Sequence, residues 1–175
     1  MSIEYKVFIA MSLDGYIAGS NNELDWLTFV NDPEEDYGYN TFLNTVDAIL
    51  MGNNTYKVVS QFPEWPYKKP VIVISSNNIA TSKVACFNGQ INELDAYMEQ
   101  ANYNNIYVDG GITISKLLAV KKISSLIITI IPIVLGGGIK LFSNFDKYIK
   151  LNLLESKTFP SGLIQIKYKV AYENQ

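Results

Sequence analysis

The sequence predicts an α/β fold with a mostly parallel sheet and an antiparallel C-terminal hairpin, in a single domain over residues 1–175. Apolar, β-branched segments alternate with helical segments through most of the chain, which is typical of a parallel sheet. Residues 151–159 and 163–172 alternate apolar and polar positions around Pro160-Ser161-Gly162, which indicates a hairpin. Residues 106–142 contain a strand, a glycine pair, a helix, a second strand and a triple glycine.

The first strand is expected at residues 5–12, which are apolar and β-rich. A long connection follows at residues 13–31, and loops of that length in compact domains often carry function. The next helix is expected to begin at Pro33, with Asp32 as its N-cap and acidic residues in its first turn, and to run to Leu43.

The remaining elements follow in the same alternation. Residues 91–101 and 113–119 are expected to be helices, and residues 55–60 a helical turn. The expected strands are the apolar runs 48–51, 71–75, 84–87, 106–108 and 126–131.

The composition limits the class of partner. The chain is 48% hydrophobic and 18% charged, with a net charge of −3, so a globular protein with a small-molecule substrate is expected rather than one that binds nucleic acid. Residues 126–135 are too short to span a membrane and are interrupted by Pro132, so no membrane association is expected. Cys86 is the only cysteine, which is compatible with a reducing, cytoplasmic location.

The sequence contains no histidine, which excludes Ser-His-Asp and Cys-His catalysis. With one cysteine as the only soft ligand, no metal site is predicted. Chemistry must then come from carboxylates, hydroxyls, backbone groups or a bound cofactor. A reductase with an organic hydride donor fits, because the cofactor carries the reactive atom.

Glycine turns after apolar segments are the first candidate sites. At residues 108–113 a glycine pair leads from a strand into a helix, which favours a phosphate site over a tight turn without a ligand. Residues 12–19, 52–55 and 136–138 are further candidates. Asp14-Gly15 could be only a turn, residues 52–55 are favoured as a helix N-cap, and residues 136–138 fit a flexible loop equally well. The acidic run 34–36 is a candidate proton source, and a solvated helix N-terminus is its alternative.

The segments SLDGYIAG, ILMGNNTYK, VISS, VDGG and IPIVLGGGIKLF, in this order, resemble the dihydrofolate reductase-like superfamily. The closer resemblance is to the reductase domain of bifunctional riboflavin-biosynthesis deaminase/reductase proteins and its stand-alone relatives. It implies a three-layer fold with a central, mostly parallel eight-stranded sheet and flanking helices. It also implies NADPH or NADH as hydride donor, and a homodimer contact near residues 151–172.

The resemblance implies cofactor-binding positions along the chain. The backbone of Ala10 would hold the nicotinamide carboxamide, and Ile17 would pack beside that ring. Asn53 stands where the family often has a basic residue that meets the 2′-phosphate of NADPH. The positions implied for the pyrophosphate and the adenosine are Gly52, Thr55, Ser75, Ser76, Gly110, Gly111, Ile112 and Thr113. In such relatives the two glycines at 110 and 111 can be joined by a cis peptide.

Two catalytic positions are also implied by the resemblance. Thr129 matches an inward-facing position near the substrate, and Asp36 is the closest match to the carboxylate that folate reductases carry on their first helix. Tyr37 or Gly38 could occupy that helix position instead. The leading hypothesis is a reductase of a pyrimidine ribosylamine phosphate or another carbonyl or imine compound. The alternatives are dihydrofolate reductase activity and a dinucleotide-binding protein without turnover.

Overall fold

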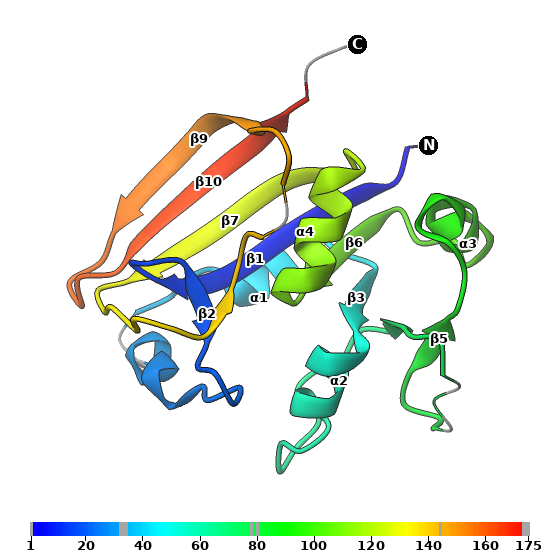
Figure 1. The fold of residues 1–175 in the computed structure, drawn as a ribbon, viewed down its shortest axis with the longest axis horizontal. Helices are drawn as coiled ribbons and strands as arrows, with labels where there is room; N and C mark the ends of the chain where they lie inside the picture. The colour runs from blue at the N-terminus through cyan, green and yellow to red at the C-terminus, as the bar shows by residue number, and fades with distance from the viewer. Residues whose placement is uncertain (1, 32–34, 78, 80, 144, 173–175) are drawn as a thin grey trace.

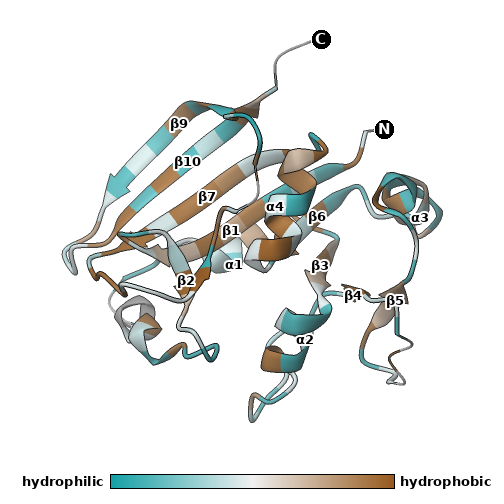
Figure 2. Ribbon diagram, in the orientation of Figure 1, coloured by the Kyte–Doolittle hydropathy of each residue, from teal (hydrophilic) through white to brown (hydrophobic). Residues whose placement is uncertain are grey.

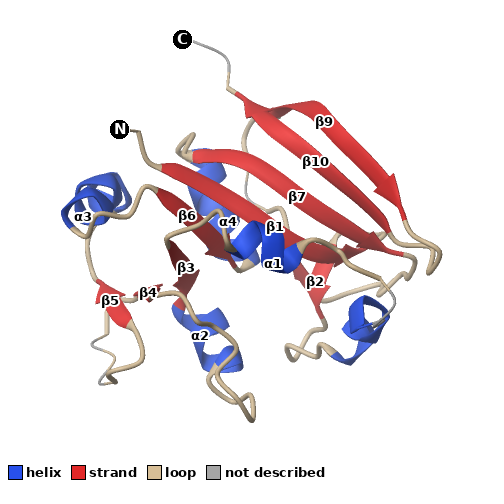
Figure 3. Ribbon diagram, turned by 180° about the vertical axis from the view of Figure 1, so that it is seen from behind, coloured by secondary structure: helices blue, strands red, loops and turns tan. Residues whose placement is uncertain are grey.

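The computed structural model describes residues 2–31, 35–77, 79, 81–143 and 145–172. An eight-stranded sheet, in the order β5-β4-β3-β6-β1-β7-β10-β9, forms the middle layer, and helices lie on both of its faces (Figures 1 and 3). A separate two-stranded ribbon pairs β2 with β8.

The strands of the main sheet are those expected, with small shifts at their ends. Six run parallel: β1 (Glu4–Ser12), β3 (Ala48–Gly52), β4 (Val71–Ile74), β5 (Ala85–Phe87), β6 (Asn105–Asp109) and β7 (Ile123–Ile131). The hairpin strands continue the sheet beyond β7: β10 (Ile164–Ala171) pairs antiparallel with β7, and β9 (Lys150–Thr158) pairs antiparallel with β10. The prediction of a mostly parallel eight-stranded sheet with an antiparallel C-terminal hairpin is therefore confirmed.

The helices are short. α4 (Gly111–Ala119) lies over the centre of one face (Figure 1). α3 (Leu94–Gln100), which the 3-10 turn η2 (Ile91–Glu93) precedes, lies toward the β5 end of the sheet (Figure 1). α1 (Tyr39–Leu43) lies over the opposite face (Figure 3). α2 (Asn53–Val59) follows β3, and the 3-10 helix η1 (Asp25–Asn31) follows β2 (Tyr16–Ala18). Within the described residues, no helix is long and apolar enough to cross a membrane.

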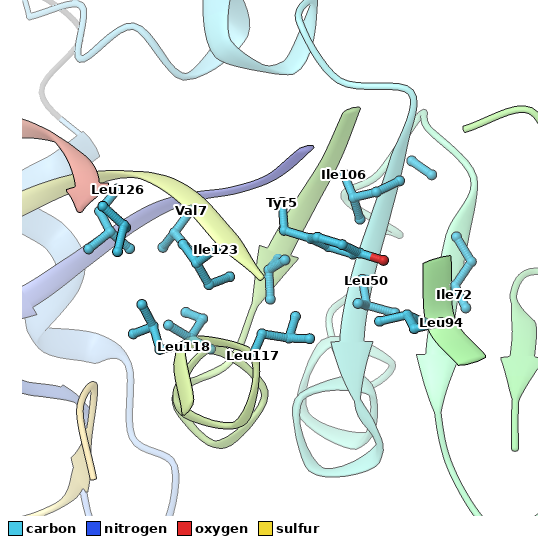
Figure 4. Close-up of a cluster of buried hydrophobic side chains, with 14 of the residues drawn as sticks. Tyr5, Val7, Leu50, Ile72, Leu94, Ile106, Leu117, Leu118, Ile123 and Leu126 are labelled. Atoms are coloured by element: carbon cyan, nitrogen blue, oxygen red, sulfur yellow. The ribbon is translucent and has the colours of Figure 1, made fainter. Parts of the chain in front are cut away.

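Alternation along the central strands divides the core between the two faces. Ile106 and Val108 of β6 belong to the cluster under α4, with Tyr5, Leu50 and Leu117 (Figure 4). Tyr107, between them in sequence, belongs to the cluster on the α1 side. Figure 2 shows the apolar character concentrated in β1 and β7, whereas β9 at the edge is largely hydrophilic. The central strands thus read as apolar runs because both of their faces are covered.

The helix expected over residues 33–43 is confirmed at Tyr39–Leu43 and wrong at residues 35–38. Asp32 and Pro33 lie outside the described residues, and the helix begins only at Tyr39. Gly38 has φ of 79°, a left-handed conformation that a continuous α-helix excludes. The Asp36 carboxylate accepts a hydrogen bond from the Gly38 N–H at 2.7 Å, so it stabilises a turn instead.

The connection at residues 13–31 contains more structure than the sequence indicated. It includes β2 and η1, and β2 pairs with β8 (Ile139–Lys140), more than 120 residues further along the chain. Strands of two or three residues leave almost no periodic signal, because only the pairing partner makes them strands.

Candidate active site

The carboxyl ends of the parallel strands lie along one edge of the sheet. β1 ends at Ser12, β3 at Gly52, β6 at Asp109 and β7 at Ile131. Each of the four glycine-containing segments identified in the sequence follows one of these ends. Open α/β sheets bind ligands at this edge, so it is the candidate active site.

The turns that follow β3 and β6 interlock. A Cβ on Gly52 would lie 2.9 Å from Thr113 Oγ1, and a Cβ on Gly110 would lie under 3.0 Å from Thr55 Oγ1. Each glycine is therefore packed against a threonine from the helix that follows the other strand. The structure thus brings together Gly52, Thr55, Gly110 and Thr113, four of the positions expected to meet a pyrophosphate.

The ribbon of β2 and β8 closes against the same turn. A Cβ on Gly111 would lie under 3.0 Å from the Lys140 carbonyl oxygen and 3.2 Å from Ile17 Cδ1. Asp14 links the two segments that lead into this ribbon, because its carboxylate accepts hydrogen bonds from the N–H groups of Leu135 and Gly136 at 3.1 and 2.8 Å. The half-buried Ile17 therefore lies directly beside the start of α4.

The start of α4 presents backbone donors at this edge. Gly110 has φ of 92°, and its carbonyl accepts the first helical hydrogen bond, from the Ile114 N–H at 2.9 Å. The N–H groups of Gly111, Ile112 and Thr113 are the first-turn groups that a helix leaves without a partner of its own. The peptide between Gly110 and Gly111 is trans, so the cis form that the resemblance allowed is not present.

The positions expected to meet the adenosine lie on the next strands along the edge. Asn53 is the first residue of α2 and is half-buried. Ser75 is buried after β4, where its N–H donates to the Phe87 carbonyl at 3.1 Å and its Oγ accepts from the Asn77 N–H at 3.1 Å. Ser76 beside it is exposed. Because β3 and β4 follow β6 in the sheet, these residues extend away from Gly110 in one direction.

On the other side of β6, three residues form a row across the sheet. Ala10 of β1 pairs with Thr129 of β7, and Thr129 pairs with Gln165 of β10. Thr129 is 2% exposed, and its Oγ1 lies 3.0 Å from Gln165 Nε2. The same nitrogen donates to the Tyr37 carbonyl oxygen at 3.0 Å, so the segment before α1 lies over this row.

Asp109 ends β6 inside a group of tyrosines. The Tyr67 hydroxyl donates to Asp109 Oδ2 at 3.0 Å. Burial raises the pKa of the Asp109 carboxyl, and the Tyr67 hydrogen bond only partly opposes this effect. Burial, reinforced by the Asp109 charge, raises the pKa of Tyr39 to about 12 and that of Tyr107 well above its usual value. A carboxyl whose protonated form is favoured in this way is suited to donate a proton.

The acidic segment before α1 is divided by the structure. Asp36 is exposed, and its carboxylate bonds to the Gly38 N–H. Glu35 accepts hydrogen bonds from the Ser161 N–H at 2.8 Å, the Ser161 hydroxyl at 2.5 Å and the Tyr37 hydroxyl at 2.6 Å. Glu35 therefore ties this segment to the turn between β9 and β10. The catalytic role of Asp36 stays a prediction.

The candidate site also includes Asp109, Tyr67 and Gln165, to which sequence reasoning gave no role. Asp109 had a signal, since it is the carboxylate directly before the glycine pair at the end of a strand. Tyr67 and Gln165 gave no signal in the sequence. Tyr67 lies 42 residues from Asp109, and Gln165 lies 36 residues from Thr129, the residues to which they are hydrogen-bonded.

Comparisons with known proteins agree with this geometry. The family model described as the RibD C-terminal domain matches residues 6–165. The uncharacterized protein YwjB of Bacillus subtilis (strain 168) is 33% identical over 167 residues, which cover 93% of this chain and 95% of that protein.

Solved structures show the same architecture. The crystal structure of a putative riboflavin biosynthesis protein from Shewanella sp. PV-4 matches with a TM-score of 0.90 and 36% identity, over 97% of this chain and 100% of that chain. A dihydrofolate reductase from Enterococcus faecalis, complexed with NADP(H), matches with a TM-score of 0.67 and 16% identity, over 95% and 96% of the two chains. The second likeness shows that the fold is dihydrofolate reductase-like.

Proposed function

Since the chain belongs to the family of RibD C-terminal domains, we propose that it is an NAD(P)H-dependent reductase that transfers a hydride to a carbonyl or imine carbon of a small molecule. The observation that carries the proposal is the position of Asp109, a carboxyl with a raised pKa directly before the glycine turn at the end of β6. This position supports Asp109 as the proton donor next to the backbone groups proposed to bind the phosphates.

A dinucleotide would lie along the carboxyl edge of the sheet. Its pyrophosphate would meet the N–H groups at the start of α4 and the Thr55 hydroxyl, and its adenosine would extend toward Ser75 and Ser76. The interlocked glycines support this placement, because any side chain there would close the approach to the backbone. The nicotinamide end would lie near Ala10 and Ile17. When bound, the dinucleotide supplies the hydride.

The protein would complete the reduction by supplying a proton. As the substrate carbon accepts the hydride, its oxygen or nitrogen gains electron density and takes the proton from the Asp109 carboxyl. The resulting carboxylate is stabilised by the Tyr67 hydroxyl and regains a proton from solvent. Placement of the acid next to the reacting group, rather than covalent chemistry, would be the protein's contribution.

The family points to a pyrimidine ribosylamine phosphate as the first substrate to test. We expect purified protein to oxidise NADPH or NADH, followed at 340 nm, when 5-amino-6-(5-phosphoribosylamino)uracil is added. Asn53 carries no charge to attract a 2′-phosphate, so we expect NADH to be used with a rate within about tenfold of that with NADPH. The same assay with dihydrofolate tests the folate reductase alternative.

Each result has a defined meaning. Oxidation of NADPH or NADH in the presence of the pyrimidine or of dihydrofolate would support the reductase proposal and would identify that compound as a substrate. Saturable dinucleotide binding, seen as quenching of Trp26 and Trp65 fluorescence, with no oxidation by either compound would favour a binding protein without turnover. Absence of binding would refute the proposal as a whole.

We also propose a homodimer that forms through the C-terminal hairpin. Figures 1 and 3 show β9 and β10 extending beyond the helices on both faces of the sheet. Leu153 and Leu154 of β9 are 61% and 55% exposed. Beside β9, on the face that carries α4, is a hollow of about 400 Å³, away from the predicted site residues. Its apolar lining is Leu118, Leu126, Phe142, Phe145, Ile149 and Leu151. Exposed apolar surface of this kind commonly marks a protein contact.

The protein is expected to sediment at twice its chain mass of 19.7 kDa at micromolar concentration. Leu153→Glu should shift it to the single-chain mass, because a charge would be desolvated at the contact. Asn152→Glu, at the neighbouring exposed position of β9, is the matched control and should remain dimeric. Sedimentation of the wild type at 19.7 kDa would contradict the proposal.

A further inference from the structure

The side-chain amide of Gln165 links two parts of the candidate site. Gln165 Nε2 lies 3.0 Å from the Tyr37 carbonyl oxygen and 3.0 Å from Thr129 Oγ1. Gln165 is half-buried on β10, and Thr129 directly opposite it on β7 is buried. One amide nitrogen therefore bridges the segment before α1 and strand β7.

The direction of both hydrogen bonds follows from the Tyr37 carbonyl. A carbonyl oxygen only accepts hydrogen bonds, so the group that faces it must be the NH2 of the amide and not its oxygen. An amide nitrogen only donates, so Thr129 Oγ1 must be the acceptor in the second bond. The carbonyl thus fixes the orientation of the amide, and the amide fixes the role of the hydroxyl.

The hydroxyl proton of Thr129 is consequently directed away from Gln165. None of the described residues accepts a hydrogen bond from it, although the side chain is buried. Thr129 lies beside Ala10, at the carboxyl end of the central strands. The Thr129 hydroxyl accepts a hydrogen bond from Gln165 and still has its own proton to donate, so it can donate to a ligand at this edge.

Asp109 and Thr129 lie on different strands at this edge. β1 separates β6 from β7, so the backbones at the two positions are roughly 10 Å apart across the sheet. One small molecule bound between them can meet both side chains.

We infer that Gln165 is a positioning residue that holds the Thr129 hydroxyl as a hydrogen-bond donor, and that the substrate presents a lone-pair acceptor, such as a ring carbonyl, to this hydroxyl. This inference rests on the proposed reductase function. It narrows the substrate class to reducible carbonyl or imine compounds that carry a hydrogen-bond acceptor for Thr129.

Three variants test the direction of the hydrogen bonds, with 5-amino-6-(5-phosphoribosylamino)uracil and NADPH as probes. Thr129→Val removes the donor and should raise KM for the pyrimidine about tenfold. Gln165→Glu should do the same, because the introduced carboxylate would accept the Thr129 proton and withdraw it from the substrate. Gln165→Leu leaves the hydroxyl free to rotate, so its KM should lie between these values and that of the wild type. KM for NADPH should stay unchanged in all three.

A second measurement does not need the substrate. In labelled protein, NMR should detect a scalar coupling across the hydrogen bond from Gln165 Nε2 to the Tyr37 carbonyl carbon. Its absence would overturn the inference, as would wild-type pyrimidine KM for Gln165→Glu. Lys167→Met, an exposed position two residues along β10, is the control for folding and should behave as the wild type. If the wild type does not reduce the pyrimidine, the pyrimidine is not its substrate, the reductase proposal is decided by dihydrofolate oxidation and dinucleotide binding, and the scalar coupling alone tests the orientation of the Gln165 amide.

Discussion

Replacing Asp109 with asparagine is expected to lower the turnover number at least about 100-fold, because the side chain could no longer donate a proton to the reduced group. Asparagine keeps the size of the side chain and can still accept the Tyr67 hydrogen bond, so the fold should be retained. The measurement is kcat for cofactor oxidation at 340 nm, together with dinucleotide binding, which should not change.

The same variant should be slightly more stable than the wild type at neutral pH. The pKa of Asp109 is raised above its unfolded value of 3.8, so the folded state favours the protonated form. Stability therefore falls as the pH rises from the unfolded to the folded pKa, and the loss persists above both. Asparagine does not titrate and removes this loss. Urea unfolding at pH 4 and pH 7 would show the difference between the two proteins widening with pH.

Tyr67→Phe and Glu64→Gln complete the test of Asp109. Without the Tyr67 hydroxyl, the pKa of Asp109 should rise further, so the pH at which activity declines should shift upward. Glu64 is exposed in the same loop, and its replacement should leave rate and pH profile unchanged. If Asp109→Asn kept kcat within about threefold of the wild type, Asp109 would not be the proton donor.

Gly111→Ala is expected to destabilise the protein by about 3 kcal/mol and to abolish dinucleotide binding. The new methyl group would lie under 3.0 Å from the Lys140 carbonyl oxygen, which is backbone and cannot rotate away. Either β8 or the start of α4 would have to move, and both flank the proposed pyrophosphate position. Urea unfolding and quenching of tryptophan fluorescence by NADPH would measure the two effects.

Gly137→Ala is the matched control for this change. Gly137 also lies in a glycine-rich segment of the same edge, but a Cβ there would meet no atom within 4 Å. Its stability should stay within about 0.5 kcal/mol of the wild type, and its cofactor affinity should be unchanged. Equal behaviour of the two alanine variants would show that the contact with Lys140 does not shape the site.

Most of the main sheet could be predicted from sequence because its strands are buried on both faces. Runs such as Ile106–Val108 in β6 are continuously apolar, and glycine or polar residues mark their ends. The hairpin of β9 and β10 could be predicted for the opposite reason, since an edge with exposed positions alternates in polarity. The start of α1 was predicted too early because acidic residues favour both a helix start and a turn. Gly38 adopts a positive φ, and the segment before it forms the turn.

The sequence by itself determined the parallel sheet, the glycine turns at its carboxyl edge and, with no histidine, the kind of chemistry that could operate there. Those features depend on neighbouring residues or on composition, so they can be read along the chain. Only the tertiary structure decided that Tyr67 meets Asp109, that Gln165 meets Thr129 and that β8 closes on Gly111. These contacts join residues that are distant in sequence, and the protonation of Asp109 depends on the burial they create.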